Sequence, residues 1–297
     1  MASRSDMTTD SRAVVRRRLP LHWLGVLPFA AFVVLFLFLP TMKIVIGAFQ
    51  TPDGGFTLAN IKGLNTPSIL AAYWISIKIS IASALLGCAI GFSVATAVIH
   101  GGLPGWIRSP LLTFSGVASN FAGVPLAFAF LATLGPVGLV TVFLRTNLGI
   151  DLRLLGFNLL SFWGLTITYL FFQIPLMILI ITPALDGLKR EWKEAASILG
   201  ATGAQYWRMV AIPILFPSLL GTFALLFANS FGAVATAIAL TGSSLSIAPI
   251  LLFAQIRGDV LSDPHLGYAL AFGMIVITGI ANAIYIWLRA RSEKWLK

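Results

Sequence analysis

Long hydrophobic runs separated by short polar segments are the dominant pattern of this 297-residue chain. A helix that crosses a bilayer needs about 20 apolar residues, because the hydrocarbon core is about 30 Å thick and a helix rises about 1.5 Å per residue. Six runs reach this length, at about 23–46, 69–99, 111–134, 159–185, 216–240 and 266–288. The pattern predicts an all-α, polytopic membrane protein with six transmembrane helices.

The segments between these runs are short and leave no room for a large soluble domain. Polar residues dominate 1–20 and 291–297, and we expect a disordered tail at the first and a short tail at the second. The six helices then form one domain at 21–290, which includes a loop at about 186–213. Charged residues among apolar ones at 137–158 predict a short interfacial helix there rather than a seventh crossing.

Composition supports the membrane class and narrows the partners. The chain is 58% hydrophobic and 10% charged, whereas an ordinary soluble domain is about 25% charged. The net charge of +10 includes an arginine cluster at 16–18, but no aromatic and basic platform accompanies it, so nucleic acid is not an expected partner. The chain has one cysteine, Cys88, so it cannot form a disulfide within itself. We expect membrane lipid to surround the hydrophobic spans.

The distribution of lysine and arginine predicts the orientation. Six crossings place both termini on one side, together with most of the basic residues. The basic residues on the other side are Lys43, Lys62, Arg145, Arg153 and Arg257, while Lys78 lies within the second run. Because cytoplasmic loops carry the excess of lysine and arginine, both termini and the loop at 186–213 are expected in the cytoplasm.

A partly polar segment at 192–213 interrupts the hydrophobic pattern between the fourth and fifth runs. Four apolar residues recur there at i, i+3, i+4 and i+7, namely Trp192, Ala195, Ala196 and Leu199. This spacing predicts a short amphipathic helix. Gly200 is predicted to end it with a positive φ.

A second helix is expected to follow the turn at Gly200. Thr202 with Gln205 three residues later is a capping-box pattern, and Pro213 is predicted to mark the bend into the fifth run. The residues alone leave two readings open. The segment is either a connector that rests in the headgroup layer or an elbow presented to the cytosol.

A family resemblance favours the elbow. It is carried by Glu194-Ala195-Ala196, by Gly200 six residues after the glutamate, and by Val210, Ile212 and Pro213. These residues resemble the EAA signature of inner-membrane permease subunits of binding-protein-dependent ABC importers of type I. The family pattern has Ile at position 210 and Leu at position 212, so both departures are conservative. The likeness covers about 20–290 and is nearest to the spermidine/putrescine permease branch.

The resemblance implies the type I ABC importer permease fold, in the bacterial cytoplasmic (inner) membrane. In that family the loop docks in a groove of an ATPase, so Glu194 would contact the ATPase, Ala195 and Ala196 would allow close approach, and Gly200 would make the turn. Expected partners are a cytoplasmic ABC ATPase dimer, a second permease subunit that is identical or homologous, and a substrate-binding protein. The sequence contains no Walker A pattern, so ATP hydrolysis is expected from a partner and this chain is expected to be non-catalytic, without cofactor or metal.

Polar residues inside the predicted spans are candidates for a translocation path. They are Asn120, Gln173, Asn229, Ser230 and Thr236. Each has an alternative role, because Ser and Thr bond back to helix carbonyls and Asn or Gln ties helices together. Lys78 is expected to extend toward the membrane interface. The resemblance suggests a polyamine as cargo and leaves phosphonate, sugar, iron and thiamine open.

Two other classes remain as alternatives. An ion-coupled secondary transporter or channel usually needs ionisable groups in the membrane, but no Asp or Glu lies within a predicted span. A membrane enzyme would need a catalytic constellation, but the three histidines, His22, His100 and His265, lie near span ends without clustered carboxylates.

Overall fold

A computed structural model describes residues 22–101, 104–242, 244–257 and 264–293. Helices make up almost all of these residues, and the described part of the chain has no β-strand beyond one isolated bridge between Gln50 and Phe56. Six helical segments are long and apolar enough to cross a membrane: Gly25–Ala48, Pro67–His100, Val124–Asn147, Phe162–Asp186, Gly203–Phe231 and Pro264–Trp287. The all-α, six-helix prediction is confirmed. The predicted tail at 1–20 and residues 294–297 of the predicted tail at 291–297 lie outside the described residues, whereas 291–293 are helical and belong to α14.

The long helices correspond to five of the six predicted runs. They are α1 His22–Val33, the π-helical segment η1 Val34–Phe38, α2 Leu39–Ala48, α4 Pro67–His100, α8 Phe162–Asp186, α11 Ile212–Phe231 and α14 Pro264–Glu293. The shorter elements are α3 Ala59–Gly63, α5 Gly105–Asn120, α6 Val124–Leu134, α7 Leu139–Asn147, α9 Arg190–Ile198, α10 Gly203–Tyr206, the π-helical segment η2 Trp207–Ala211, α12 Val234–Thr241 and α13 Ala248–Arg257.

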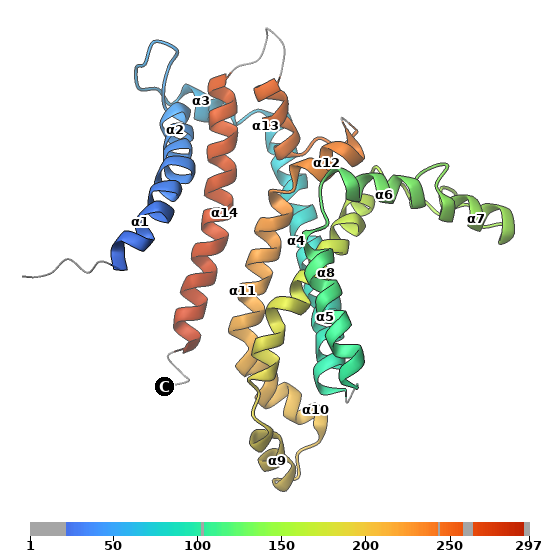
Figure 1. The fold of residues 1–297 in the computed structure, drawn as a ribbon. Helices are drawn as coiled ribbons and strands as arrows, with labels where there is room; N and C mark the ends of the chain where they lie inside the picture. Colours follow the sequence, from blue (N-terminus) through green and yellow to red (C-terminus); the bar gives the residue numbers. More distant parts are fainter. Residues whose placement is uncertain (1–21, 102–103, 243, 258–263, 294–297) are drawn as a thin grey trace, which may run out of the picture.

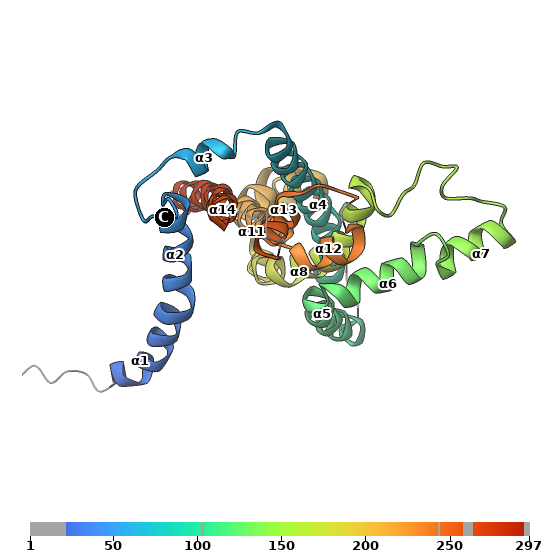
Figure 2. The same cartoon turned by 90° about the horizontal axis from the view of Figure 1, so that it is seen from above.

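The helices α4, α8, α11 and α14 run along the long axis of the molecule (Figure 1). We call the end that carries α9 and α10 the loop end, and the end that carries α3 the far end. The helices α6 and α7 extend sideways near the far end, and α1 with α2 diverges from the bundle on the opposite side (Figure 2). None of the hydrophobic window within Gly25–Ala48 is buried, so lipid or another chain must cover this helix.

Close contact between α4 and α8 forms the centre of the bundle. A Cβ atom at Gly87 would lie 2.9 Å from Cβ of Gln173, and one at Gly91 would lie 2.6 Å from Cβ of Met177 and 2.9 Å from the carbonyl oxygen of Ile174. Small residues one turn apart allow helices to approach this closely in a membrane. The glycines therefore set the spacing of the two helices.

Gly91→Ala should lower the midpoint of thermal unfolding, measured on the purified protein in detergent. The added methyl group meets backbone of α8, and overpacking of this kind costs about 1–3 kcal/mol. Gly116→Ala in α5 is the matched control, because a Cβ atom there has nothing within 4 Å. Equal unfolding midpoints for the two variants would contradict the close packing at Gly91.

The prediction that the third run, at about 111–134, forms a single crossing is wrong. The helix breaks at 121–123, between α5 and α6, and α6 turns away from the bundle (Figure 1). Gly123 has a φ of 76°, a conformation that glycine adopts without steric cost. The short helix expected within 137–158 is confirmed as α7, which extends sideways with α6.

The fifth predicted run, at about 216–240, is also divided. It ends as α11 at Phe231, and α12 begins at Val234 after a turn at 232–233. The segment that follows contains a further helix, α13, between the fifth and sixth predicted runs. Hydropathy cannot detect either change, because apolar residues continue on both sides of each turn.

Pro213 lies in the first turn of α11, and this helix follows the preceding segment η2 without a break. The chain is helical from Gly203 through Phe231, and the π-helical segment η2 precedes the proline. The N–H group of Ile212 donates to the carbonyl of Trp207, five residues back. Proline lacks an N–H group and its ring collides with the preceding helical turn, so the wider π turn accommodates it. The segment η1 stands at the same distance before Pro40.

Lys78 is exposed on α4, and its amine lies 5.0 Å from the ring centroid of Trp74. Trp74 is one turn nearer the far end of α4, so the side chain extends toward that end. This geometry agrees with the expectation that Lys78 reaches for the membrane interface.

Candidate functional site

The loop between α8 and α11 folds as two short helices joined by a tight turn. Gly200 follows α9 with a φ of 80°, as predicted. The Thr202 hydroxyl accepts from the Gln205 N–H, and the Gln205 side chain accepts from the Thr202 N–H. The predicted capping box is therefore confirmed, and it fixes the start of α10 immediately after the turn.

The loop has a small hydrophobic cluster of its own. Ala196, Tyr206 and Ala211 are buried together, and Trp192 and Trp207 pack against them. Ala196 therefore lies inside the loop, where the cluster requires a small side chain, and Ala195 is the exposed member of the pair. This cluster allows the loop to keep its shape at the end of the bundle.

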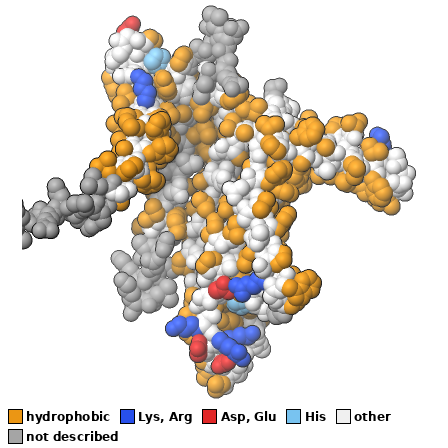
Figure 3. Space-filling model, in the orientation of Figure 1, with side chains coloured by type: hydrophobic (Ala, Val, Ile, Leu, Met, Phe, Trp, Pro, Cys, Tyr) orange, Lys and Arg blue, Asp and Glu red, His pale blue; other side chains and the backbone are white. Residues whose placement is uncertain are grey.

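The outward surface of the loop combines charge with apolar side chains. Glu194 is 58% exposed and its carboxylate accepts a 2.9 Å ion-paired hydrogen bond from Arg190 Nε. Ile198 and Leu199 are 85% and 86% exposed. Figure 3 shows charged side chains gathered at the loop end, below a mostly hydrophobic surface. Apolar side chains this exposed beside charges are typical of a surface that binds another protein.

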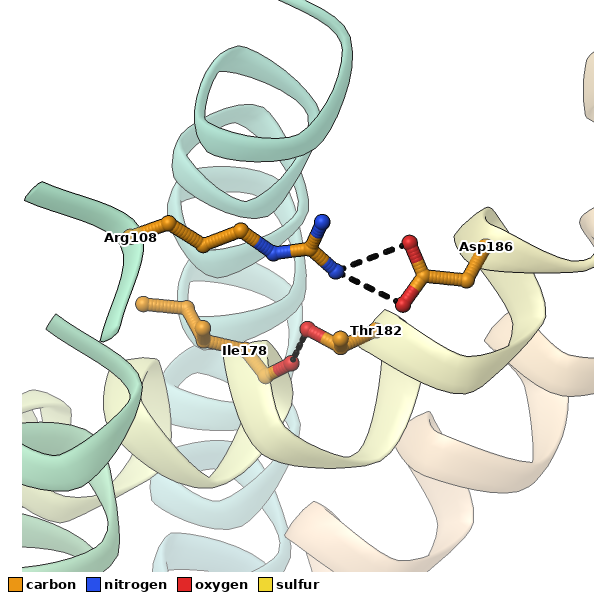
Figure 4. A network of polar contacts seen from close by, with 4 residues as sticks. All are labelled: Arg108, Ile178, Thr182 and Asp186. Carbon is orange, nitrogen blue, oxygen red and sulfur yellow. Dashed lines mark hydrogen bonds and ion pairs between the residues drawn. The ribbon is translucent and has the colours of Figure 1, made fainter. Parts of the chain in front are cut away.

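An ion pair lies where α8 leads into the loop. Arg108 Nη2 of α5 donates to both carboxylate oxygens of Asp186, at 2.9 and 2.8 Å (Figure 4). One turn earlier on α8, the Thr182 hydroxyl donates back to the Ile178 carbonyl at 2.7 Å. The pair is partly exposed, with side-chain exposures of 37% for Arg108 and 44% for Asp186.

The polar candidates inside the spans divide into two groups, and the first is a buried cluster. The Gln173 amide of α8 donates to the Leu226 carbonyl at 2.9 Å and to the Ser230 hydroxyl, both on α11. Ser230 is also hydrogen-bonded to Ser83 of α4, at 2.8 Å between the hydroxyl oxygens. Gln173 and Ser230 thus join α4, α8 and α11, and their role is to pack these helices together.

The second group lies at a cavity of about 330 Å³ near the far end. Its lining residues are Ser119, Ala122, Gly123, Phe172, Ala228, Asn229, Gly232, Ala233, Val234, Ala235 and Thr236. Asn229 is exposed to this cavity, and the Thr236 hydroxyl accepts from the Gly123 N–H at 2.7 Å. Asn120 is exposed beside the cavity and donates to the Gly116 carbonyl at 2.9 Å, while its neighbour Ser119 lines the wall.

The cavity forms where the two helix breaks meet. A hydrogen bond from Gly123 to Thr236 joins the turn at 121–123 to the start of α12, and both α6 and α12 begin at the wall. Non-helical backbone at membrane depth is tolerated where it lines such a space. Sequence reasoning missed Ser119, Gly123 and Gly232. The glycine in each turn was the only sequence feature that could have indicated a break in the helix.

No three His, Cys, Asp or Glu side chains gather as a metal site among the residues that the structure describes.

Comparison with known proteins identifies the family. Residues 153–297 match the model of the binding-protein-dependent transport system inner membrane component. Residues 153–297 of this chain belong to this family. The matched region begins before α8 and runs through the loop, the cavity helices α11 and α12, and α14.

Relatives of this inner membrane component carry two different substrate names. The sulfate transport system permease protein CysT of Synechococcus elongatus is 26% identical over 264 residues, covering 86% of this chain and 89% of that protein. The spermidine/putrescine transport system permease protein PotC of Escherichia coli K12 is 22% identical over 251 residues, covering 82% and 85%.

Solved structures agree with the fold of the component. A bacterial ABC transporter involved in the import of the acidic polysaccharide alginate matches with a TM-score of 0.70 and 16% identity, over 93% of this chain and 96% of that chain. The MetNI methionine ABC transporter matches with a TM-score of 0.52 and 15% identity, over 75% and 95%. The type I importer permease fold is thus confirmed.

Proposed function

We propose that this chain forms the translocation path of an ATP-driven importer for a small solute that a substrate-binding protein delivers. The cavity at the two helix breaks is the observation that carries the proposal. It holds the polar side chains Ser119, Asn229 and Thr236 inside an otherwise hydrophobic bundle. Broken helices of this kind surround the substrate sites of many transporters.

The loop end supplies the contact with the source of energy. Its folded elbow and its exposed Glu194, Ile198 and Leu199 suit docking onto an ATPase subunit. On this proposal the loop end and both termini lie in the cytoplasm, as the lysine and arginine distribution predicts. Glu194, Ala195 and Gly200 act at the docking surface, whereas Ala196 and Pro213 act by shaping the elbow.

A second permease subunit, identical or homologous, completes the path. The cavity is open, and the described residues bury none of the hydrophobic window of Gly25–Ala48. A paired subunit would close the cavity and pack on the helix at Gly25–Ala48. A dimer of ATPase subunits then serves both loops.

For the cargo we propose a small oxyanion. Asp186, at the loop end of α8, is the only acidic residue in the described spans, and the side chains that line the cavity are uncharged. The helices α6 and α12 start at the cavity, and helix N-termini carry partial positive charge. The CysT relative carries sulfate in its name, in agreement with this electrostatic argument.

A polyamine is the second candidate, because of the PotC relative. A polyamine carries several positive charges and would need carboxylates or aromatic rings in the path to replace its hydration. The cavity wall offers one aromatic residue, Phe172, and no carboxylate. The wall therefore favours the oxyanion.

Uptake by the complete transporter tests the cargo. The permease, its ATPase and its cognate binding protein are reconstituted in vesicles, and ATP-dependent uptake of labelled sulfate and labelled spermidine is measured. We expect sulfate to accumulate and spermidine to remain at the level without ATP, with a matching sulfate-induced rise in the unfolding temperature of the binding protein. Accumulation of spermidine alone would contradict the oxyanion proposal and leave the importer proposal standing.

A further inference from the structure

The charges of Arg108 and Asp186 are placed unfavourably within their own helices. Arg108 lies in the first turn of α5, and Asp186 is the last residue of α8. A helix N-terminus carries partial positive charge and a C-terminus partial negative charge, so each terminus repels the charge it holds. Neither residue stabilises its own helix electrostatically. Each side chain instead gains a favourable electrostatic interaction from the ion pair that joins α5 to α8 (Figure 4).

Packing also holds α5 to the bundle, mainly through α8. Ser115 and Ala118 are buried, and Leu111 and Leu112 near the loop end of α5 are partly buried against the main core. The two-oxygen hydrogen bonding from Arg108 is directional. The pair therefore adds a directional link between the loop end of α5 and the end of α8 to this packing.

The opposite end of α5 belongs to the cavity. Ser119 lines its wall, and the turn at 121–123 follows directly. Eleven residues separate Arg108 from Ser119, which is about 16 Å along a helix. Asp186 is four residues before Arg190, where α9 begins. A continuous helix thus joins the base of the loop to the cavity wall through one ion pair.

We propose that Arg108 and Asp186 form a clasp that makes α5 follow the loop, so that a displacement of the loop reaches the cavity wall. This inference rests on the proposed function. Both residues act as positioning residues and contact neither cargo nor ATPase. Coupling of this kind passes through packed helices and ion pairs that connect two sites.

Charge exchange gives the decisive variant. In Arg108→Asp the loop end of α5 is released, and in Arg108→Asp with Asp186→Arg the pair is restored with each charge favoured by its own helix terminus. The exchanged protein should unfold at or above the wild-type temperature. Arg145→Asp, which alters an exposed arginine of α7, is the matched control.

Distances between spin labels report the clasp directly. Labels at Thr113 of α5 and Ser197 of α9, both exposed, are introduced in a Cys88→Ala background, and the complex with its ATPase is measured without nucleotide and with ATP and vanadate. We expect the distance to be equal in the two states for the wild type and the exchanged protein. In Arg108→Asp the two states should differ, because α5 no longer follows the loop.

Transport gives a second readout. Labelled sulfate imported per ATP hydrolysed should fall about tenfold in Arg108→Asp, a typical allosteric coupling, and return in the exchanged protein. Unchanged distances and yield in a folded Arg108→Asp would overturn the clasp, as would failure of the exchange to restore them. If Glu194→Arg also leaves the yield unchanged, the proposed function itself fails. If Glu194→Arg reduces it and Arg108→Asp does not, only the clasp fails.

Discussion

Glu194→Arg is expected to reduce ATP-driven uptake about a hundredfold, at the upper end of typical coupling between two sites. The side chain is exposed and ion-paired with Arg190, and Lys193 is adjacent, so the substitution gathers three positive charges on the surface proposed to meet the ATPase. The interior of the loop is not touched. We expect normal membrane insertion and retained basal ATP hydrolysis, with uptake measured in reconstituted vesicles.

Two companion variants make this result specific. Asp53→Arg reverses an exposed acidic charge at the far end and should leave uptake unchanged. Gly200→Val forces a β-branched side chain onto a φ of 80°, which costs about 1–3 kcal/mol, and should resemble Glu194→Arg by distorting the turn. Wild-type uptake and cargo-stimulated ATP hydrolysis in Glu194→Arg would contradict the coupling role of the loop.

Asn229→Trp should block the path and lower uptake about tenfold or more, because the dimensions and lining of a pathway govern its passage of solute. Asn229 faces the cavity of about 330 Å³, which an indole ring would narrow. Asn282→Trp is the matched control, since Asn282 is exposed on α14 and its side chain hydrogen-bonds within its own helix. Uptake of labelled sulfate by the two variants gives the comparison.

The charge of the cargo can be tested at the same residue. Asn229→Asp keeps the size of the side chain and adds a negative charge, and two like charges about 4 Å apart repel by about 4 kcal/mol at a surface-like dielectric constant. Uptake of an oxyanion should therefore fall further in Asn229→Asp than in Asn229→Ser. A higher uptake of spermidine in Asn229→Asp would instead favour the polyamine.

The loop was predictable from sequence because its structure is local. A glycine that ends a helix and a Thr–Gln capping box act within a few residues of one another, so Gly200, Thr202 and Gln205 could be read directly. The six hydrophobic runs were likewise visible. The EAA resemblance, in the half of the chain that the family model matches, added the family.

The cavity could not be predicted, because it depends on contacts between distant segments. The bond from Gly123 to Thr236 joins residues 113 positions apart, and hydropathy continues through both turns. The polar candidates illustrate the same limit. Gln173 and Asn229 are equally polar in sequence, but the register of each helix buries the first against α11 and turns the second toward the cavity.

The π-helical segment before Pro213 sets the direction in which the loop faces. A π turn holds one residue more than an α turn, and one residue corresponds to a rotation of about 100° around a helix axis. Removing a single residue between 207 and 211 would rotate α9 by that angle about the axis of α11 and turn Glu194 to another side of the protein. The number of residues before the proline, rather than their identity, thus aims the loop.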